Sequence, residues 1–173
     1  MTKILVVIDM QNDFIDGSLG TKEAQAIVKN VINKVIAHDY DKLCFTQDTH
    51  FKNYLETQEG KNLPVPHCIY GTRGWELQKD LKVAARLEGA LVVEKTSFGA
   101  TSLREYFLNY DYDLEFEVVG LCTDICVISN VLILKALFPE AKITVDSSCC
   151  AGTTPEKHEA ALKVMRSCQI EVI

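Results

Sequence analysis

The sequence lacks any apolar run approaching the roughly 20 residues that a membrane-spanning helix requires. The apolar run before Asp9 is only five residues long, and without a small-residue cleavage site it does not resemble a signal peptide. Basic residues are outnumbered by acidic ones, 18 against 24, which gives a formal net charge of −6. We therefore expect a cytoplasmic protein that binds neither membranes nor nucleic acid, since no excess of basic charge is available to neutralise phosphates.

The cysteines do not fit a disulfide framework. The chain has seven of them, and an odd count without a secretory signal favours free thiols. Most are expected to be small core residues, but at least one is a candidate reactive group. The seven are Cys44, Cys68, Cys122, Cys126, Cys149, Cys150 and Cys168.

Length and composition are those of an ordinary globular protein. The chain has 173 residues, of which 47% are hydrophobic and 24% charged. Neither repeats nor a linker interrupt it, so we expect residues 1–173 to form a single domain.

Short apolar segments, most of them rich in β-branched residues, alternate with segments of helical periodicity. The predicted strands are Lys3–Ile8, Leu43–Thr46, Leu91–Val93, Glu115–Leu121, Lys142–Val145 and Gln169–Ile173. The predicted helices are Ala24–His38, Gly74–Arg86, Ser102–Asn109, Asp124–Phe138 and Pro155–Ser167, the last with Thr154 as its N-cap. This alternation predicts an α/β fold, a three-layer α/β/α sandwich around a central, mostly parallel sheet of about six strands.

One stretch, Phe51–Tyr70, shows no clear periodicity and contains Gly60, Pro64 and Pro66. It is long for a loop in a compact domain. Loops of this length are usually either functional or disordered.

Two charged residues come at or just after predicted strand ends, where open parallel sheets bind ligands. Asp9 directly follows the first strand, and Lys95 lies two residues after the end of Leu91–Val93. Taken singly, Asp9 is equally well explained as a turn-capping residue, and Lys95 as a solvated surface lysine. Together they form a candidate ion pair, and the positive charge of Lys95 could also stabilise a nearby thiolate.

Cys126 lies where a strand passes through a turn that contains Gly120 and enters a helix. The unpaired N–H groups and positive dipole end of such a helix lower the pKa of a thiol there, so we expect a reactive thiolate. The same N–H groups could stabilise an oxyanion. A buried structural cysteine is the alternative.

A candidate metal site surrounds the irregular stretch. Asp48 and His50 follow the predicted strand Leu43–Thr46, and His67 lies in the stretch after Glu56 and Glu59. Carboxylate and imidazole ligands suit zinc, manganese or iron.

Five motifs carry a family resemblance. They are Val7–Phe14, Thr46–His50, Leu63–Cys68, Glu94–Gly99 and Gly120–Val127. In order and spacing they resemble the isochorismatase-like cysteine hydrolase superfamily, and within it the nicotinamidase/pyrazinamidase branch. The resemblance covers nearly the whole chain, and the Gly-x-x-Thr-Asp-x-Cys-Val motif is its most specific part.

The resemblance implies a role for each residue of a triad. Cys126 would be the nucleophile, Asp9 the general acid and base, and Lys95 the third member. A cis peptide before Cys122 is typical of the family, whose oxyanion is held by the N–H groups at the positions of Cys122 and Cys126. The implied reaction converts nicotinamide to nicotinate and ammonia through a thioester and feeds NAD salvage.

The resemblance also implies a divalent transition metal, zinc in the first instance, with manganese or iron as alternatives. Asp48, His50 and His67 match its ligands directly. Glu59 takes the place of the second histidine of many members, with Glu56 in reserve.

For the substrate pocket, Phe14 matches an aromatic residue that lines it, and Leu63 stands where many members carry a large aromatic side chain. The small-molecule substrate could therefore be a carbamoyl, ureido or biuret-type amide in place of nicotinamide. Less favoured are the vinyl-ether-cleaving isochorismatase branch and a binding or regulatory protein without turnover. The family further implies a homo-oligomer, a dimer or a tetramer.

Overall fold

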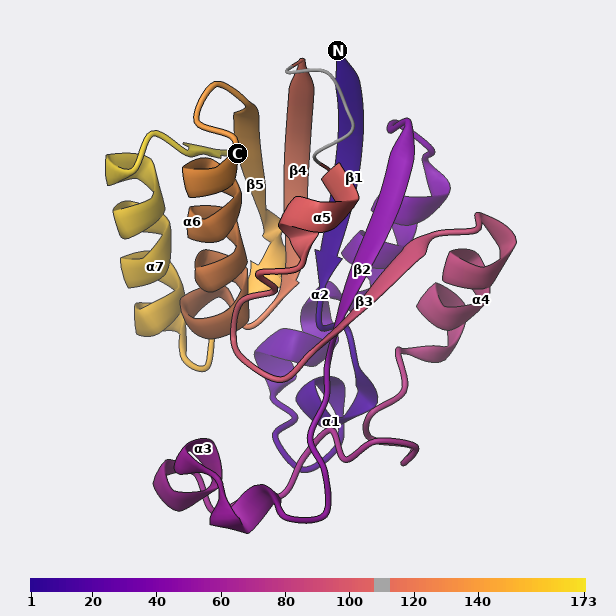
Figure 1. Cartoon of the computed structure of the whole chain (residues 1–173), viewed down its shortest axis with the longest axis vertical. Coiled ribbons are helices and arrows are strands. Elements are labelled where there is room, and N and C mark those ends of the chain that lie inside the picture. Colours follow the sequence, from indigo (N-terminus) through magenta and orange to yellow (C-terminus); the bar gives the residue numbers. More distant parts are fainter. Residues whose placement is uncertain (108–112) are drawn as a thin grey trace.

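The computed structural model describes residues 1–107 and 113–173. Within these residues the predicted α/β sandwich is confirmed, because six parallel strands form one sheet in the order β3-β2-β1-β4-β5-β6 (Figure 1). The strands are β1 (Thr2–Ile8), β2 (Lys42–Asp48), β3 (Leu91–Lys95), β4 (Leu114–Leu121), β5 (Lys142–Ala151) and β6 (Glu171–Val172). Each predicted strand is present, and β2, β3 and β5 extend further than predicted. The prediction Gln169–Ile173 is too long, because Gln169 lies in a turn with φ 65° and β6 covers only Glu171–Val172.

The central strand β1 shows why both faces of the sheet are covered. Ile4, Val6 and Ile8 pack into the hydrophobic core on one face, whereas Leu5 and Val7 pack into the core on the other. Successive side chains of a strand point to opposite faces, so a continuous apolar run needs a helical layer on each side.

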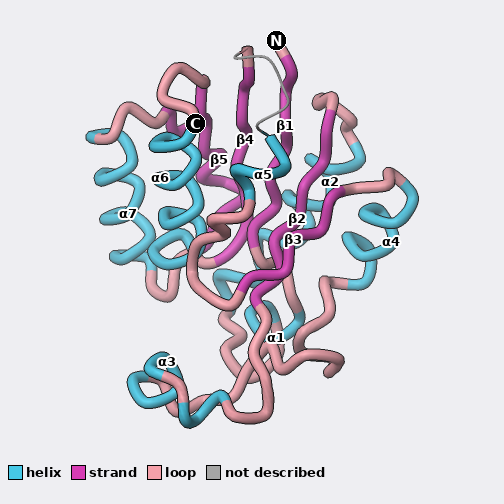
Figure 2. Tube along the Cα trace, viewed as in Figure 1, coloured by secondary structure: helices cyan, strands magenta, loops and turns pink. Residues whose placement is uncertain are grey.

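The helices form those two layers (Figure 2). Buried side chains of α2 (Lys22–Ile36) and α4 (Lys79–Leu87) join the core that contains Leu5. Those of α5 (Leu103–Phe107), α6 (Ile128–Leu137) and α7 (Pro155–Ser167) join the core on the opposite face. The short elements are α1 (Asn12–Ile15), η1 (Tyr54–Glu56), α3 (Gln58–Asn62) and the π-helical turn η2 (Thr123–Val127).

Helix boundaries follow capping side chains. Thr154 caps α7 as predicted, since its hydroxyl accepts the N–H of Lys157. The prediction that a helix begins at Gly74 is wrong, because the side chain of Gln78 caps α4 and starts it at Lys79. Of the predicted helix Ser102–Asn109, residues 108–109 lie outside the described residues.

The irregular stretch Phe51–Tyr70 contains two short helical elements that periodicity could not reveal, η1 and α3. Thr57 caps α3 by accepting the N–H of Gly60. A Cβ at Gly60 would lie 2.0 Å from the carbonyl oxygen of Tyr54, so only glycine allows α3 to fold this closely onto η1. In Figure 1 this segment lies beyond the carboxyl ends of the strands.

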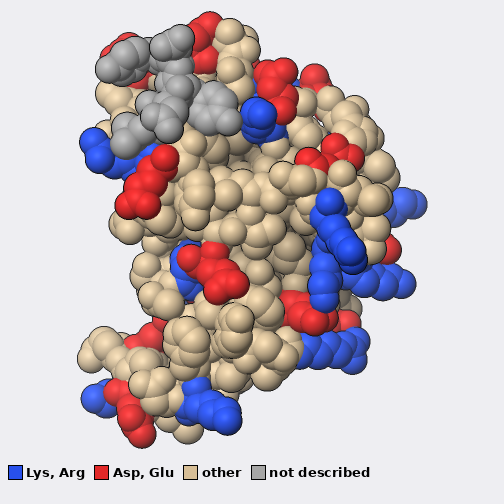
Figure 3. Space-filling view, turned by 45° about the vertical axis from the view of Figure 1, so that its right-hand side comes forward, with Lys and Arg blue, Asp and Glu red and all other residues tan. Residues whose placement is uncertain are grey.

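No helix among the described residues is both long and apolar enough to cross a membrane. On the face shown in Figure 3, basic and acidic side chains lie interspersed.

Candidate active site

Four neighbouring strands bring the predicted site residues to one edge of the sheet. Asp9 directly follows β1, while Asp48 and Lys95 are the last residues of β2 and β3 and stand side by side in the register. Beyond β4, the turn η2 carries Cys126. A Cβ at Gly120 would lie 2.1 Å from the carbonyl oxygen of Ile8, so glycine permits the close approach of β1 and β4 just before this site.

The ammonium group of Lys95 contacts the side chains of Asp9, Asp48 and Cys126, and these four residues form one cluster. Its Nζ lies 2.6 Å from Oδ2 of Asp9, 3.3 Å from Oδ1 of Asp48 and 3.6 Å from Sγ of Cys126. All four side chains are buried. Burial lowers the pKa of Lys95, but Asp9, Cys126 and Asp48 outweigh it and hold the pKa above its usual value. Lys95 is therefore a buried cation matched to two carboxylates and a thiol.

Asp9 is held on both carboxylate oxygens. The hydroxyl of Thr46 donates to Oδ1 at 2.6 Å, and the backbone N–H of Asp9 donates back to the same hydroxyl oxygen at 3.2 Å. The backbone at Asp9 has φ 44°, in the left-handed region that aspartate tolerates better than most residues. Burial raises the pKa of Asp9 above its usual value, and the positive charge of Lys95 opposes that rise.

The expectation of a lowered thiol pKa at Cys126 is wrong for this structure. Burial raises the pKa of the thiol well above its usual value, and the neighbouring Asp9 raises it further, while Lys95 opposes both. The sulfur is in contact with Lys95, whose Nζ donates to Sγ at 3.6 Å. This arrangement therefore keeps the thiol of Cys126 protonated until Asp9 accepts the proton.

The four predicted metal ligands come together next to this cluster. One ligand atom each from Asp48, His50, Glu59 and His67 lies within 4.8 Å of the other three. Nε2 of His50 is 3.0 Å from Oδ2 of Asp48, and Nε2 of His67 is 3.6 Å from the same oxygen. Both nitrogens lie 3.5 Å from Oε1 of Glu59. Glu56, the reserve ligand, is exposed and does not belong to this group.

The donor set fits a divalent transition metal. Nδ1 of His67 lies 2.8 Å from the carbonyl oxygen of Val65, a contact that leaves Nε2 free to ligate a metal. Nε2 of His50 is buried and has no aligned hydrogen-bond partner among the described residues, as expected of a nitrogen that awaits an ion. Two imidazoles and two carboxylates suit zinc, and also manganese or iron.

Proton equilibria in this group reflect the crowding of carboxylates and imidazoles. Burial lowers the pKa of His50 and His67, but the nearby carboxylates of Asp48 and Glu59 outweigh it and raise both pKa values to about 9. Burial raises the pKa of Glu59, but the two histidines outweigh it and lower the pKa to about 2. Without a metal, the positive charges of the two protonated imidazoles therefore balance the negative charges of the Asp48 and Glu59 carboxylates at neutral pH.

A cavity of about 490 Å³ opens onto both groups. Asp48, Glu59 and His67 line it together with Cys122 and Cys126. The peptide bond between Leu121 and Cys122 is cis, as the resemblance predicts. The remaining lining residues are Phe14, Leu19, Thr21, Asn62, Leu63, Phe98, Ile125, Thr153 and Lys157.

Both residues predicted to contact substrate, Phe14 and Leu63, line this cavity. The ring of Phe14 lies 5.5 Å from that of His67, centroid to centroid. Leu63 is 38% exposed at the cavity. Phe98, 47% exposed, supplies an aromatic surface that the sequence did not assign to the pocket.

The sequence did not reveal the polar residues that hold the site in place. Thr46 hydrogen-bonds Asp9, and Gln11 bonds the backbone N–H and carbonyl of Asp48. Asn130 bonds the carbonyl of Cys126. Thr46 and Gln11 lie inside the family motifs, which is the signal that could have identified them, whereas Asn130 lies beyond any motif.

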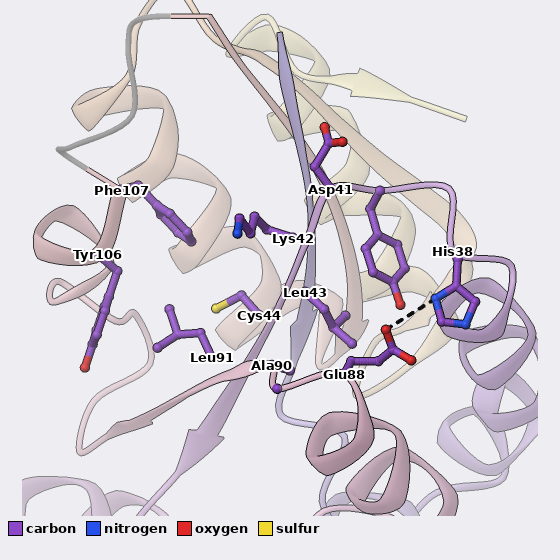
Figure 4. Close-up of a pocket in the computed structure, with 12 residues that line it drawn as sticks. His38, Asp41, Lys42, Leu43, Cys44, Glu88, Ala90, Leu91, Tyr106 and Phe107 are labelled. Carbon is purple, nitrogen blue, oxygen red and sulfur yellow. Dashed lines mark ion pairs between the residues drawn. The ribbon is translucent and has the colours of Figure 1, made fainter.

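A second cavity, of about 580 Å³, lies at the other ends of β2 and β3 (Figure 4). His38 and Glu88, which both line it, form an ion pair at 3.4 Å on one side of the cavity. Its cysteine, Cys44, is buried, which raises the pKa of the thiol to about 12. The Cys44 thiol donates to the carbonyl oxygen of Phe45 at 3.9 Å, so among the described residues it lacks the arrangement of base and cation that surrounds Cys126.

Comparisons with known proteins agree with this geometry. The chain is 26% identical to the nicotinamidase/pyrazinamidase of Mycobacterium tuberculosis over 99% of this chain and 98% of that protein. It is 26% identical to the nicotinamidase of Schizosaccharomyces pombe over 98% and 91%. The crystal structure of the Bacillus subtilis nicotinamidase superposes with a TM-score of 0.87 at 28% identity and 99% coverage of both chains. The model of the isochorismatase domain matches residues 3–173, and the chain therefore belongs to the isochorismatase family, as its motifs predicted.

Proposed function

We propose that this protein is an amidohydrolase that converts nicotinamide and water to nicotinate and ammonia. The observation that carries the proposal is the position of Lys95, whose Nζ lies 2.6 Å from Asp9 and 3.6 Å from Sγ of Cys126. A thiol, a carboxylate and a buried cation at this spacing make up a nucleophile, its base and the charge that tunes both. The near full-length similarity to nicotinamidases supports the choice of substrate.

In the first half-reaction, Asp9 accepts the thiol proton as Sγ of Cys126 attacks the carboxamide carbon. The backbone N–H groups of Cys122 and Cys126 hold the negative charge that develops on the amide oxygen. Asp9 then passes the proton to the leaving nitrogen, so that ammonia departs and a thioester remains on Cys126. The raised pKa values of both groups support this exchange, because a thiol that keeps its proton at rest needs a base, and a carboxylate with a raised pKa is a stronger base than an ordinary one.

In the second half-reaction, Asp9 removes a proton from a water molecule that attacks the thioester carbon. The carbon–sulfur bond breaks, the thiol of Cys126 recovers the proton, and nicotinate leaves. Lys95 supports both halves by keeping Asp9 and the sulfur in an electrostatic field that favours their charged forms. Thr46 keeps the carboxylate pointed at the reacting atoms.

Asp48, His50, Glu59 and His67 would hold a divalent metal, for which zinc is our first choice. When bound, such an ion supplies a Lewis acid that faces the cavity, and the pyridine nitrogen of nicotinamide is the complementary donor. The complete ligand set therefore favours nicotinamide, which offers such a donor, over a carbamoyl or ureido amide.

The same proposal covers the setting of the reaction. From its length and composition we propose a single domain over residues 1–173 and a cytoplasmic location. The family resemblance adds a place in pyridine nucleotide salvage and a homo-oligomeric state. Light scattering on the purified protein tests the oligomeric state.

The proposal is tested by measuring ammonia release from nicotinamide with the wild type, with Cys126→Ala and with chelator-treated wild type. We expect activity in the wild type, none in the folded C126A variant, and loss after chelation that zinc restores. Activity only on a ureido or carbamoyl compound would replace nicotinamide with that substrate class.

A further inference from the structure

A fully buried asparagine joins the nucleophile to the wall of the substrate cavity. Asn130 lies on α6, four positions after Cys126, and its side chain has 0% exposure. Its Nδ2 donates to the carbonyl of Cys126 at 2.7 Å and to the carbonyl of Phe98 at 3.1 Å. Its Oδ1 accepts the backbone N–H of Ala100 at 2.8 Å. Both amide hydrogens and the amide oxygen are therefore engaged with backbone groups.

The segment bound by Asn130 connects two parts of the site. Residues 96–100 begin directly after Lys95, and Phe98 in this segment lines the cavity together with Cys126. The segment approaches α6 closely, since a Cβ at Gly99 would lie 2.3 Å from Cδ1 of Ile133. Its position therefore depends on the face of α6 that carries Asn130.

We propose that Asn130 is a positioning residue that sets the distance between the Cys126 nucleophile and the aromatic wall formed by Phe98. It does so through backbone carbonyls, which fix the two segments without touching substrate. The inference rests on the proposed function to the extent that Phe98 contacts the substrate ring. Its effect on the position of Cys126 stands on the hydrogen bonds alone.

Asn130→Leu removes all three hydrogen bonds in a side chain of similar size. We expect kcat/KM to fall by on the order of 10- to 100-fold, because small displacements of reacting groups reduce rates by such factors. If N130L displaces the Phe98 wall, most of the change should appear as a higher KM. If it displaces Cys126, most of the change should appear as a lower kcat. Ser129→Ala is the matched control on the same helix, since it removes only the hydroxyl bond to the carbonyl of Ile125, and we expect its kinetics to stay within about twofold of the wild type.

The isosteric Asn130→Asp provides a readout that a purely structural role would not move. It keeps an acceptor for the N–H of Ala100 and lacks a donor until the new carboxyl is protonated. Its activity relative to the wild type should therefore rise as the pH falls from about 8 to about 6, since burial raises the pKa of a carboxyl. If N130L does not fold, N130D still tests the role of Asn130.

A double-mutant cycle separates action through Phe98 from an independent effect. If Asn130 acts through the wall, the losses of N130L and Phe98→Ala on KM should be strongly non-additive. The rate at which iodoacetamide alkylates Cys126, followed on its peptide by mass spectrometry, reports the nucleophile without any amide substrate. We expect this rate to change in N130L and not in S129A.

Wild-type kinetics and an unchanged alkylation rate in folded N130L or N130D would overturn the inference, as would losses that multiply independently with those of F98A. Failure of the wild type on nicotinamide would instead remove the proposed function. The alkylation rates would still decide the role of Asn130 in that case.

Discussion

Lys95 and Asp9 face each other at 2.6 Å with neither side chain open to solvent. A buried charge without its partner is strongly destabilising, so this pair links the stability of the fold to the chemistry of the site. Asp48 stands 3.3 Å from the same ammonium group, which makes Lys95 the counter-ion of two carboxylates.

Lys95→Met should therefore abolish activity and lower the free energy of unfolding by about 3–5 kcal/mol. Two buried carboxylates, Asp9 and Asp48, would be left together without a cation. The loss should shrink as the pH falls, because protonation of one carboxylate relieves the repulsion. Urea unfolding of metal-free K95M and wild type at several pH values measures both effects. An equally large deficit at low and high pH would contradict the proposed repulsion.

The assignment of Glu59 as a metal ligand has a matched control in the same segment. Glu59→Gln should weaken zinc binding by at least about 10- to 100-fold, the range seen when even supporting residues of a metal site are removed. Glu56→Gln changes the same charge on an exposed side chain outside the donor group and should leave affinity unaltered. Competition with a chromophoric chelator measures both affinities, and equal values for the two variants would remove Glu59 from the site.

Metal binding should release protons. The pKa values of His50 and His67 are about 9 without metal, so both imidazoles are protonated at neutral pH and must lose a proton to ligate an ion. We predict the release of about two protons per ion near pH 7. Calorimetric titrations in buffers of different ionisation enthalpy measure that number, and binding without proton release would contradict the proposed ligands.

The same groups give the metal-free protein a defined pH dependence. The histidine pKa values are raised from 6.5, so their contribution to stability is complete below pH 6.5 and is lost as the pH rises through about 9. The Glu59 pKa is lowered from 4.5, so its contribution is present above pH 4.5 and is lost as the pH falls towards about 2. Urea unfolding of the metal-free wild type should show this loss of stability between pH 6.5 and 9, and the double variant His50→Asn/His67→Asn should lack it.

Much of the architecture could be read from the sequence because its signals are local. Each strand is a short apolar run, and the alternation of Ile4 and Leu5 between two cores requires helices on both faces. The site residues could be placed because Asp9, Asp48 and Lys95 all stand at strand ends. The helix α3 could not, since five residues carry no apolar stripe and depend on the contact between Gly60 and Tyr54.

The pKa of Cys126 also escaped prediction. Its place at the start of a helix suggests a lowered pKa, but the sequence does not show that the thiol is buried against Asp9, and burial dominates. Partners such as Thr46 and Asn130 are buried polar residues whose roles depend on contacts made only in the folded chain.

The pocket offers a test of substrate identity. Leu63→Phe should lower KM for nicotinamide by about 2- to 10-fold, because an aromatic pair adds about 0.5–1.5 kcal/mol beyond its buried area. Leu55→Phe is the control, since Leu55 is 53% exposed and does not line the cavity. A KM unchanged or raised in L63F and unchanged in L55F would show that the ring does not lie against residue 63.

The central claim is that the thiol of Cys126 attacks a carboxamide and carries the acyl group. Acid quenching of zinc-loaded wild type during turnover of nicotinamide, followed by mass spectrometry of the peptide containing Cys126, tests it most directly. The account predicts a nicotinoyl thioester on Cys126 that is absent from C126A and from a sample without substrate. Ammonia release by folded C126A at the wild-type rate, with no acyl group on the wild-type peptide, would contradict it.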